Sequence, residues 1–237
     1  MHPKYLIWDF DGTLGYRTGA WRGPLAEVLL REIPDSNLTA ADFRPYVQGG
    51  FRWHNPERTH RAGLNSDDWW AELLPVFENA YRMAAGLSDG DAQRMARAVR
   101  ACYLEPEYWR LFDDVLPCLT ELTADRWRHV VLSNHVPELP QIIEALGLAP
   151  HIERIFNSAV TGYEKPHPQA FQNVIETLGS VDALWMIGDN VTADVAGAKT
   201  AGIRAILVRS RHPDSEHCCD RLQGLRTVLS LGKSSLG

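Results

Sequence analysis

Residues 5–14 read Tyr5-Leu6-Ile7-Trp8-Asp9-Phe10-Asp11-Gly12-Thr13-Leu14, and the rest of the chain is organised around them. The run Tyr5-Leu6-Ile7 has no polar alternation, which is typical of a central parallel strand that is buried on both faces. We expect the backbone to turn out of the sheet at Gly12. The pattern therefore predicts a buried strand that ends at a pair of carboxylates.

Asp9 and Asp11 are two residues apart, so the strand period places both carboxylates on one side at the carboxyl end of this strand. Phe10 then points away from them, toward the core. Two carboxylates held this close repel each other, so one of them must be protonated or a cation must lie between them. The motif thus predicts a partner, either a proton or a cation, that offsets this repulsion.

Composition excludes several classes of protein. The chain has 237 residues, 45% hydrophobic and 23% charged, which is ordinary for a globular protein with a sizeable core. A net charge of −6 disfavours sequence-independent binding to nucleic acid or to an anionic membrane, because both need a basic surface. The four cysteines form neither a zinc spacing nor a disulfide framework. With no apolar run of about 20 residues and no signal-peptide pattern, we expect a cytoplasmic protein without a membrane partner.

A helical segment interrupts the pattern after the first strand. Gly15, Gly19 and Gly23 predict a flexible connection out of the core. Helical apolar spacing follows over residues 24–33, 67–83 and 91–103, and no strand signal interrupts it. We therefore expect an all-helical insertion over residues 17–105, with a core built from residues 1–16 and 106–237.

From residue 106 the chain alternates between strands and helices. The expected strands are 129–132, 155–156, 183–187 and 205–208, and the expected helices are 116–124, 140–146, 169–178, 193–201 and 222–231. This alternation predicts an α/β fold with a doubly wound, mostly parallel, Rossmann-like sheet, in which ligands bind outside the carboxyl ends of the strands. Ser133-Asn134 and Gly188-Asp189 follow two of these strands, so we expect them at the same edge as Asp9 and Asp11.

Four ordered motifs resemble those of the haloacid dehalogenase (HAD) superfamily of phosphatases and related hydrolases. They are Asp9 to Leu14, Val131-Leu132-Ser133-Asn134, Glu164-Lys165-Pro166, and Gly188-Asp189 with Asp194. The helical insertion resembles the cap domain of this superfamily in its position and its class. Each motif alone is a weak or moderate signal, but four in order, each after the right kind of element, point to this superfamily.

The resemblance implies separate roles for the carboxylates. Asp9 would be the nucleophile that takes a phosphoryl group. Asp11 would be the general acid that protonates the leaving oxygen and then the base that activates water. Asp189 would bind Mg²⁺ together with the Asp9 carboxylate and the Asp11 backbone carbonyl. Asp194 would be either a further ligand or a carboxylate that orients water on the metal.

The resemblance also implies partners for the phosphoryl group. Ser133 would hydrogen-bond a phosphoryl oxygen, and Lys165 would offset the charge that develops on the transferred group. Thr13 and Asn134 are further candidates for substrate contact, and structural hydrogen bonding is the alternative for both.

The expected function is a Mg²⁺-dependent phosphatase that hydrolyses a small phosphorylated metabolite through an aspartyl-phosphate intermediate. Asp11 favours phosphate chemistry over dehalogenation, since a halide leaving group needs no proton. A cap of this size would restrict access to small molecules. Its candidate substrate-binding residues, for which packing or solvation is the alternative, are Arg17, Trp21 and Arg22. A phosphomutase, a phosphonate hydrolase, a 2-haloacid dehalogenase and a catalytically silent HAD-like binding protein stay open, as does the oligomeric state.

Overall fold

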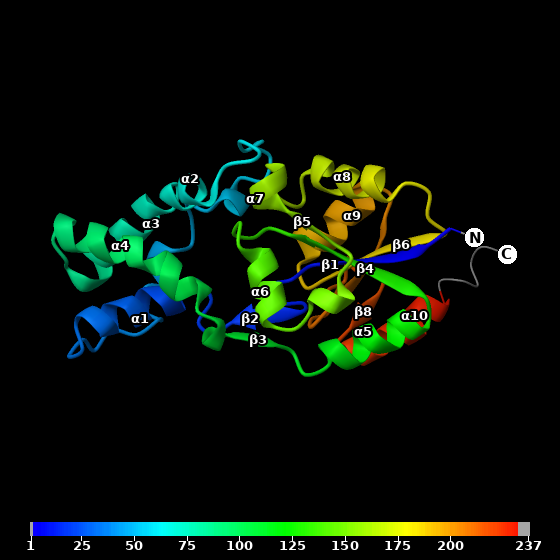
Figure 1. The fold of residues 1–237 in the computed structure, drawn as a ribbon, viewed down its shortest axis with the longest axis horizontal. Coiled ribbons are helices and arrows are strands. Elements are labelled where there is room, and N and C mark those ends of the chain that lie inside the picture. The colour runs from blue at the N-terminus through cyan, green and yellow to red at the C-terminus, as the bar shows by residue number, and fades with distance from the viewer. Residues whose placement is uncertain (1, 232–237) are drawn as a thin grey trace. The chain divides into compact units, whose positions relative to one another are not determined.

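The computed structural model describes residues 2–231. Its contacts divide the chain into two compact units, drawn as a ribbon in Figure 1. The core unit comprises Met1–Tyr16, Pro56–Gly63 and Leu111–Gly237, and the helical unit comprises Arg17–Asn55 and Leu64–Arg110. The expected insertion, residues 17–105, differs from the helical unit in two places. Residues 56–63 belong to the core unit, and residues 106–110 belong to the helical unit.

Six strands form one parallel sheet in the core unit. Their order across the sheet is β5-β4-β1-β6-β7-β8, and neighbouring strands run parallel. The strands are β1 (Lys4–Trp8), β4 (Trp127–Ser133), β5 (Arg154–Asn157), β6 (Ala183–Gly188), β7 (Arg204–Val208) and β8 (Cys218–Cys219). β1 lies between β4 and β6, with Trp8 opposite Val131 and Ile187. The predicted α/β fold class and the central place of the first strand are therefore confirmed.

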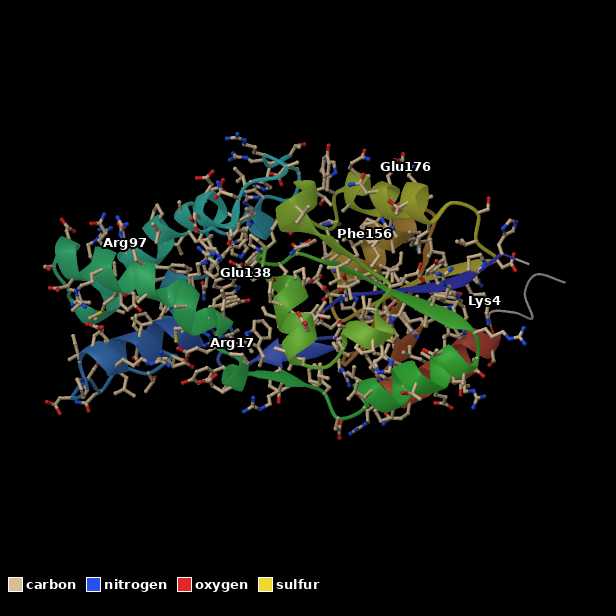
Figure 2. The ribbon with its side chains drawn as sticks, viewed as in Figure 1. Lys4, Arg17, Arg97, Glu138, Phe156 and Glu176 are labelled. Atoms are coloured by element: carbon tan, nitrogen blue, oxygen red, sulfur yellow. The ribbon has the colours of Figure 1, made fainter. Side chains whose placement is uncertain are left out.

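The side chains of β1 pack on both faces of the sheet. Tyr5 and Ile7 belong to a buried cluster that contains Phe156, labelled in Figure 2, and residues of α8 (Pro168–Leu178) and α9 (Gly197–Thr200). The alternate residues Leu6 and Trp8 are also fully buried and point to the other face. Figure 1 shows α8 and α9 on one side of the sheet, with α5 (Val115–Ala124) and α10 (Leu225–Leu231) on the other. Burial on both faces explains the uninterrupted apolar run.

Several short elements differ from the expectation. The expected loop 158–166 contains a one-turn helix, α7 (Ser158–Thr161), and the expected helix 193–201 is a π-helix, η5 (Val191–Ala196), continued by α9. β8 was not expected, nor were β2 (Gly15–Arg17) and β3 (Trp109–Leu111), which pair in a separate two-stranded sheet. Strands of two or three residues are too short to show a period. The remaining elements of the core unit are α6 (Leu139–Ala145), η4 (Ala149–His151) and η6 (Leu222–Gly224).

The helical unit contains four helices. They are α1 (Arg22–Glu32), α2 (Ser66–Ala71), α3 (Leu74–Ala85) and α4 (Asp89–Leu104), with the 3-10 turns η1 (Arg44–Tyr46), η2 (Arg52–His54) and η3 (Pro106–Tyr108). The helical pattern expected over 67–83 is split into α2 and α3, because Pro75 occupies the first turn of α3. None of the helices described in residues 2–231 is long and apolar enough to cross a membrane.

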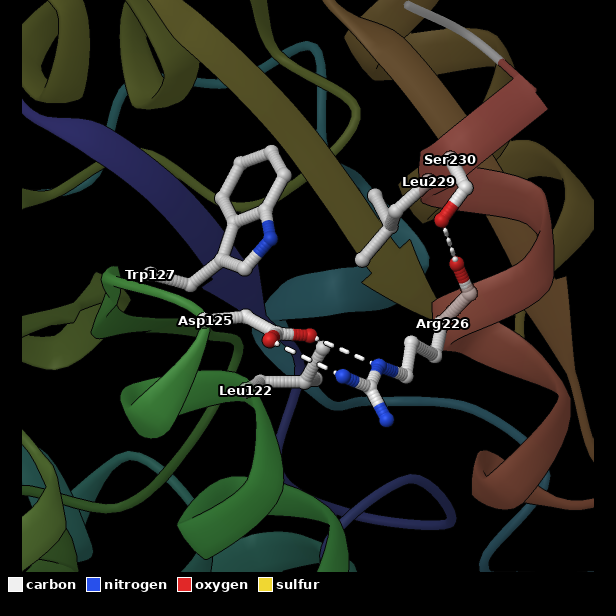
Figure 3. A pocket seen from close by; sticks show the side chains of 6 residues that line it. All are labelled: Leu122, Asp125, Trp127, Arg226, Leu229 and Ser230. Atoms are coloured by element: carbon white, nitrogen blue, oxygen red, sulfur yellow. Dashed lines mark hydrogen bonds and ion pairs between the residues drawn. The ribbon is translucent and has the colours of Figure 1, made fainter.

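A pocket of about 270 Å³ lies at the start of β4 in the core unit (Figure 3). Its lining residues come from α5, β4, α10 and the turn before β4, and they are Leu122, Asp125, Trp127, Arg226, Leu229 and Ser230. An ion pair at 2.8 Å joins Asp125 to Arg226. Because Trp127 is the first residue of β4, this pocket lies at the amino ends of the strands. The expected catalytic residues follow the carboxyl ends, so the pocket is not the candidate active site.

Candidate active site

The turn that follows β1 holds the first motif against the end of β6. Its backbone closes through hydrogen bonds from Gly12 N to Gly15 O (2.8 Å) and from Gly15 N to Phe10 O (3.0 Å). Gly12 has a φ of +81°, and a Cβ atom there would lie 2.3 Å from Oδ2 of Asp189. Only glycine therefore permits both this turn and the close approach of the Asp189 carboxylate.

Lys165 joins two carboxylates from different segments, Asp9 after β1 and Asp194 in η5. Its Nζ donates to Oδ1 of Asp9 at 2.7 Å and to Oδ1 of Asp194 at 2.6 Å, and its side chain is only 2% exposed. Burial opposes the charge on this ammonium group, but Asp194 and Asp9 outweigh burial and raise the pKa of Lys165 above its usual range. Lys165 is therefore held as a cation directly beside Asp9.

Asn134 fixes the backbone that carries Lys165. The Lys165 N–H donates to Oδ1 of Asn134 at 2.7 Å, and Nδ2 of Asn134 donates to the Lys165 carbonyl at 2.9 Å. This pair of bonds occupies both ends of the Asn134 amide. Asn134 therefore has a structural role in this arrangement, and substrate contact by it stays a prediction.

Asp194 is fully buried at the start of the segment that follows β6. Its Oδ2 accepts a hydrogen bond from Asn190 N at 3.0 Å, while Oδ1 accepts from Lys165. The side chain of Asn190 in turn accepts from the backbone of residues 192 and 193, which ties down the first turn of η5. A Cβ atom on Gly188 would lie 2.1 Å from Oδ2 of Asp194, so glycine at 188 permits this packing.

The acidic side chains of the site could hold a metal ion. Asp9, Asp189 and Asp194 each offer an oxygen atom, and these atoms all lie within 4.8 Å of one another. Burial raises the pKa of Asp189 and of Asp194, and the charge of Asp9 raises both further against the opposing effect of Lys165. Since carboxylate oxygens are the ligands that Mg²⁺ prefers, these residues fit a divalent cation. Both oxygens of Asp194 already accept hydrogen bonds, so Asp9 and Asp189 are better placed for direct ligation.

Asp11 is the fourth carboxylate at this edge. Burial at the crowded strand ends, followed by the charges of Asp9 and Asp189, raises the pKa of Asp11 to about 8. The Asp11 side chain is 43% exposed, which limits its desolvation and leaves the charges of Asp9 and Asp189 as a strong cause of the shift. Without a cation beside it, these two charges favour the protonated form of Asp11.

Two hydroxyl groups complete the polar contacts. Ser133, the last residue of β4, donates from Oγ to Oδ1 of Asp9 at 3.1 Å. Thr13 lies 3.4 Å from Oδ1 of Asp189 through its Oγ1. The structure thus brings together the eight expected residues of the four motifs, which are Asp9, Asp11, Thr13, Ser133, Asn134, Lys165, Asp189 and Asp194. Their individual roles stay predictions.

His135 lies in this site and was not among the expected residues. It follows Ser133-Asn134 directly, its ring is fully buried, and its Nε2 lies 3.5 Å from Oδ2 of Asp11. Burial lowers the pKa of His135 to about 4, so the ring is neutral near pH 7. The sequence signal was its adjacency to the second motif, but a single histidine after a strand is more often a packed core residue.

The three residues expected from the insertion belong to the helical unit. Arg17 is buried and donates to the carbonyls of Tyr103 (3.1 Å) and Cys102 (2.9 Å) and to Glu27 (2.6 Å). Figure 2 labels Arg17 on the ribbon. These bonds satisfy its guanidinium group within the helical unit. They weigh against substrate binding by Arg17, which stays a prediction.

Trp21 belongs to an aromatic cluster. Its ring stacks on Tyr103, with centroids 4.3 Å apart, and also contacts Phe51 and Trp53. Arg22 is a partly exposed residue at the start of α1. Packing therefore accounts for Trp21 in the helical unit, and substrate contact by Trp21 or Arg22 stays a prediction.

Comparisons of the sequence give consistent results. A protein-family model described as haloacid dehalogenase-like hydrolase matches residues 3–202. The phosphoserine phosphatase of Thermus thermophilus is 30% identical over 185 residues, which cover 77% of this chain and 72% of that protein. The haloacid dehalogenase-like hydrolase domain-containing protein 3 of Bos taurus is 26% identical over 218 residues, which cover 90% and 84%.

Solved structures resemble the whole chain. The HAD-hydrolase YfnB of Bacillus subtilis, bound to magnesium, has a TM-score of 0.72 and 21% identity, and the match covers 97% of this chain and 99% of that chain. A 2-haloacid dehalogenase of Pseudomonas syringae has a TM-score of 0.65 and 24% identity, with coverage of 96% and 98%. At these identities the structures support the fold alone. Because the family model spans most of the sequence, the chain belongs to the haloacid dehalogenase-like hydrolases.

Proposed function

We propose that this hydrolase is a Mg²⁺-dependent phosphatase that acts on a small phosphorylated metabolite through a phosphoaspartate at Asp9. The observation that carries the proposal is the pair of donors on one oxygen of Asp9, Lys165 Nζ at 2.7 Å and Ser133 Oγ at 3.1 Å. Asp11 lies two residues further on, where an acid is of use only if the leaving group needs a proton. The 30% identical relative is named as a phosphatase, which supports the same reaction class.

In the first step, an oxygen of the Asp9 carboxylate attacks the phosphorus of the substrate. The bond from phosphorus to the leaving oxygen breaks, and Asp11 gives its proton to that oxygen, so that an alcohol departs. Lys165 and Ser133 would bind the phosphoryl oxygens as negative charge moves onto them. The products of this step are phosphorylated Asp9 and ionised Asp11.

In the second step, a water molecule attacks the same phosphorus atom. Asp11, now a carboxylate, accepts a proton from this water, and the bond from phosphorus to the Asp9 oxygen breaks. Inorganic phosphate leaves, Asp9 regains its carboxylate, and Asp11 regains its proton. The cycle consumes one water molecule and leaves the enzyme unchanged.

Asp9 and Asp189 are the residues that would hold Mg²⁺, together with the backbone carbonyl of Asp11. When bound, the ion would supply positive charge that offsets the carboxylates and the anionic substrate. Asp194 would act mainly by holding Lys165, because its two oxygens bind Lys165 and Asn190. With the cation on Asp9 and Asp189 and with Lys165 beside Asp194, the four acids would not repel the anionic substrate.

The test is phosphate release from p-nitrophenyl phosphate and a panel of small phosphorylated metabolites, with Mg²⁺ and with EDTA. We expect metal-dependent release that the Asp9→Asn variant lacks, while that variant keeps the circular dichroism spectrum and melting temperature of the wild type. Phosphate release that persists in Asp9→Asn would exclude Asp9 as the nucleophile. Phosphate release that EDTA leaves unchanged would exclude a metal-dependent reaction. Chloride release from 2-haloacids without phosphate release would make the enzyme a dehalogenase instead.

A further inference from the structure

We propose that His135 is a positioning residue that holds the carboxyl group of Asp11 toward the leaving oxygen. The inference rests on the proposed phosphatase reaction, in which Asp11 is the acid. It gives a role to a buried polar side chain that the mechanism above does not use. It also predicts which substrates depend on His135.

The geometry places a fully buried group against a partly exposed one. The His135 side chain is 0% exposed and the Asp11 side chain is 43% exposed, and Nε2 of His135 lies 3.5 Å from Oδ2 of Asp11. This separation is longer than a standard hydrogen bond. Catalytic contacts are often long without substrate and shorten in the complex, so the distance is compatible with a hydrogen bond during reaction.

The surroundings of His135 fix its ring. The Phe10 ring meets it edge to face, with centroids 5.5 Å apart at an angle of 82°. The His135 backbone N–H donates to Oγ of Ser158, a buried residue at the start of α7, at 3.2 Å. The ring of His135 and its backbone are therefore both held by contacts within the core unit.

Asp11 needs such a partner because the turn fixes only its backbone. The hydrogen bond from Gly15 N to Phe10 O closes the chain around Asp11 but leaves its side-chain torsions unset. Lys165 is committed to Asp9 and Asp194. Nε2 of His135 lies beside the Asp11 carboxyl group. His135 is thus the group placed to set the direction of that carboxyl.

The leaving group decides how much this direction matters. An alkoxide leaving group is strongly basic and gains much from a well-placed proton, whereas 2,4-dinitrophenolate leaves readily without one. General acid catalysis is worth roughly 10²–10⁴-fold, and a displacement of about 1 Å can cost on the order of 10²-fold. The ratio kcat/KM reports only events up to departure of the leaving group, so it isolates the proton donation from the later attack of water.

The experiment measures kcat/KM of the Mg²⁺-loaded enzyme for the best alkyl phosphate found and for 2,4-dinitrophenyl phosphate, in wild type, His135→Leu and His135→Gln. We expect His135→Leu to lose roughly 10–100-fold on the alkyl phosphate and less than about 3-fold on the aryl phosphate. The amide of His135→Gln should restore part of the alkyl activity. His129→Asn, a variant at another buried histidine that contacts Trp8 instead, should keep the wild-type ratio between the two substrates.

Equal losses on both substrates, or no loss on either, would overturn the proposal. If His135→Leu does not fold, the same comparison in His135→Gln decides. A second measurement uses the background Asp11→Asn, in which adding His135→Gln should cause no further loss on the alkyl phosphate. A further loss there would show that His135 does not act through Asp11. Failure of the proposed function itself would look different, since the wild type would then release no phosphate from either compound.

Discussion

Replacing His129 by asparagine should change how the stability of the protein depends on pH. Nδ1 of His129 accepts a hydrogen bond from Nε1 of Trp8 at 3.0 Å, and Nε2 lies 3.1 Å from Oγ1 of Thr123. The Thr123 hydroxyl donates to the Leu119 carbonyl, so it accepts from Nε2. Protonation of Nδ1 would set two N–H groups against each other. The folded protein therefore favours the neutral ring.

The magnitude follows from the two pKa values of this ring. Burial, with a smaller effect from His151, lowers the pKa of His129 from 6.5 to about 4 in the folded protein. Between these values the unfolded chain binds more protons than the folded one, so the free energy of unfolding falls as pH falls. The His129 contribution is fully present above pH 6.5, and about 2 kcal/mol of it is lost between pH 8 and pH 5.

The assay is urea unfolding of wild type and His129→Asn at pH 5, 6, 7 and 8. Asparagine keeps an acceptor for Trp8 but does not titrate, so the variant lacks this part of the pH dependence. We expect the difference in free energy of unfolding between the two proteins to shift by about 2 kcal/mol, in favour of the variant at pH 5. Taking the difference cancels the contribution of every other titrating group that the substitution leaves unchanged. A difference in the free energy of unfolding between wild type and variant that stays constant from pH 8 to pH 5 would refute the reasoning.

Two further substitutions test the active site. Gly12→Ala should lower kcat at least 10²-fold and destabilise the protein by about 1–3 kcal/mol, because the new Cβ would lie 2.3 Å from the Asp189 carboxylate at a φ of +81°. Phosphate release and thermal unfolding measure these effects, and wild-type kcat would contradict the close approach. Asn134→Ala should lower kcat about 10–10²-fold by freeing the Lys165 backbone, with Asn134→Asp keeping only the bond from Lys165 N–H. An unchanged kcat in Asn134→Ala would show that Lys165 is held by other means.

The central sheet could be predicted from the sequence because its cause is local. Tyr5-Leu6-Ile7 lacks polar residues since β1 is buried on both faces between β4 and β6. The turn at Gly12 could be predicted too, although not the reason for glycine. That reason is the approach of Asp189, which lies 177 positions further along the chain. Packing between distant segments leaves no periodic signal in either one.

The side chains around the motifs show the same limit. Polar residues at strand ends indicated where the site lies, but not that Asn134 binds the Lys165 backbone rather than a substrate. Arg17 was a candidate for substrate binding because its side chain is charged and lies in the insertion. Its partners are Glu27 and two carbonyls more than 80 residues away, and only the fold brings them together. No sequence pattern singles out His135, because its contact with Asp11 depends on the fold.

The negative charge of its acidic side chains explains why this site needs a positively charged partner. Folding brings Asp9, Asp11, Asp189 and Asp194 together with the Lys165 ammonium group. Burial, followed by this excess of negative charge, raises the pKa of the last three acids. For these groups the folded state binds protons more tightly than the unfolded one, so their contribution to stability grows as pH falls, opposite in sign to that of His129. Either bound protons or a divalent cation can offset this excess of negative charge. A cation that replaces the protons would therefore stabilise the folded core as well as serve the reaction, because it binds a set of carboxylates that only the folded chain assembles.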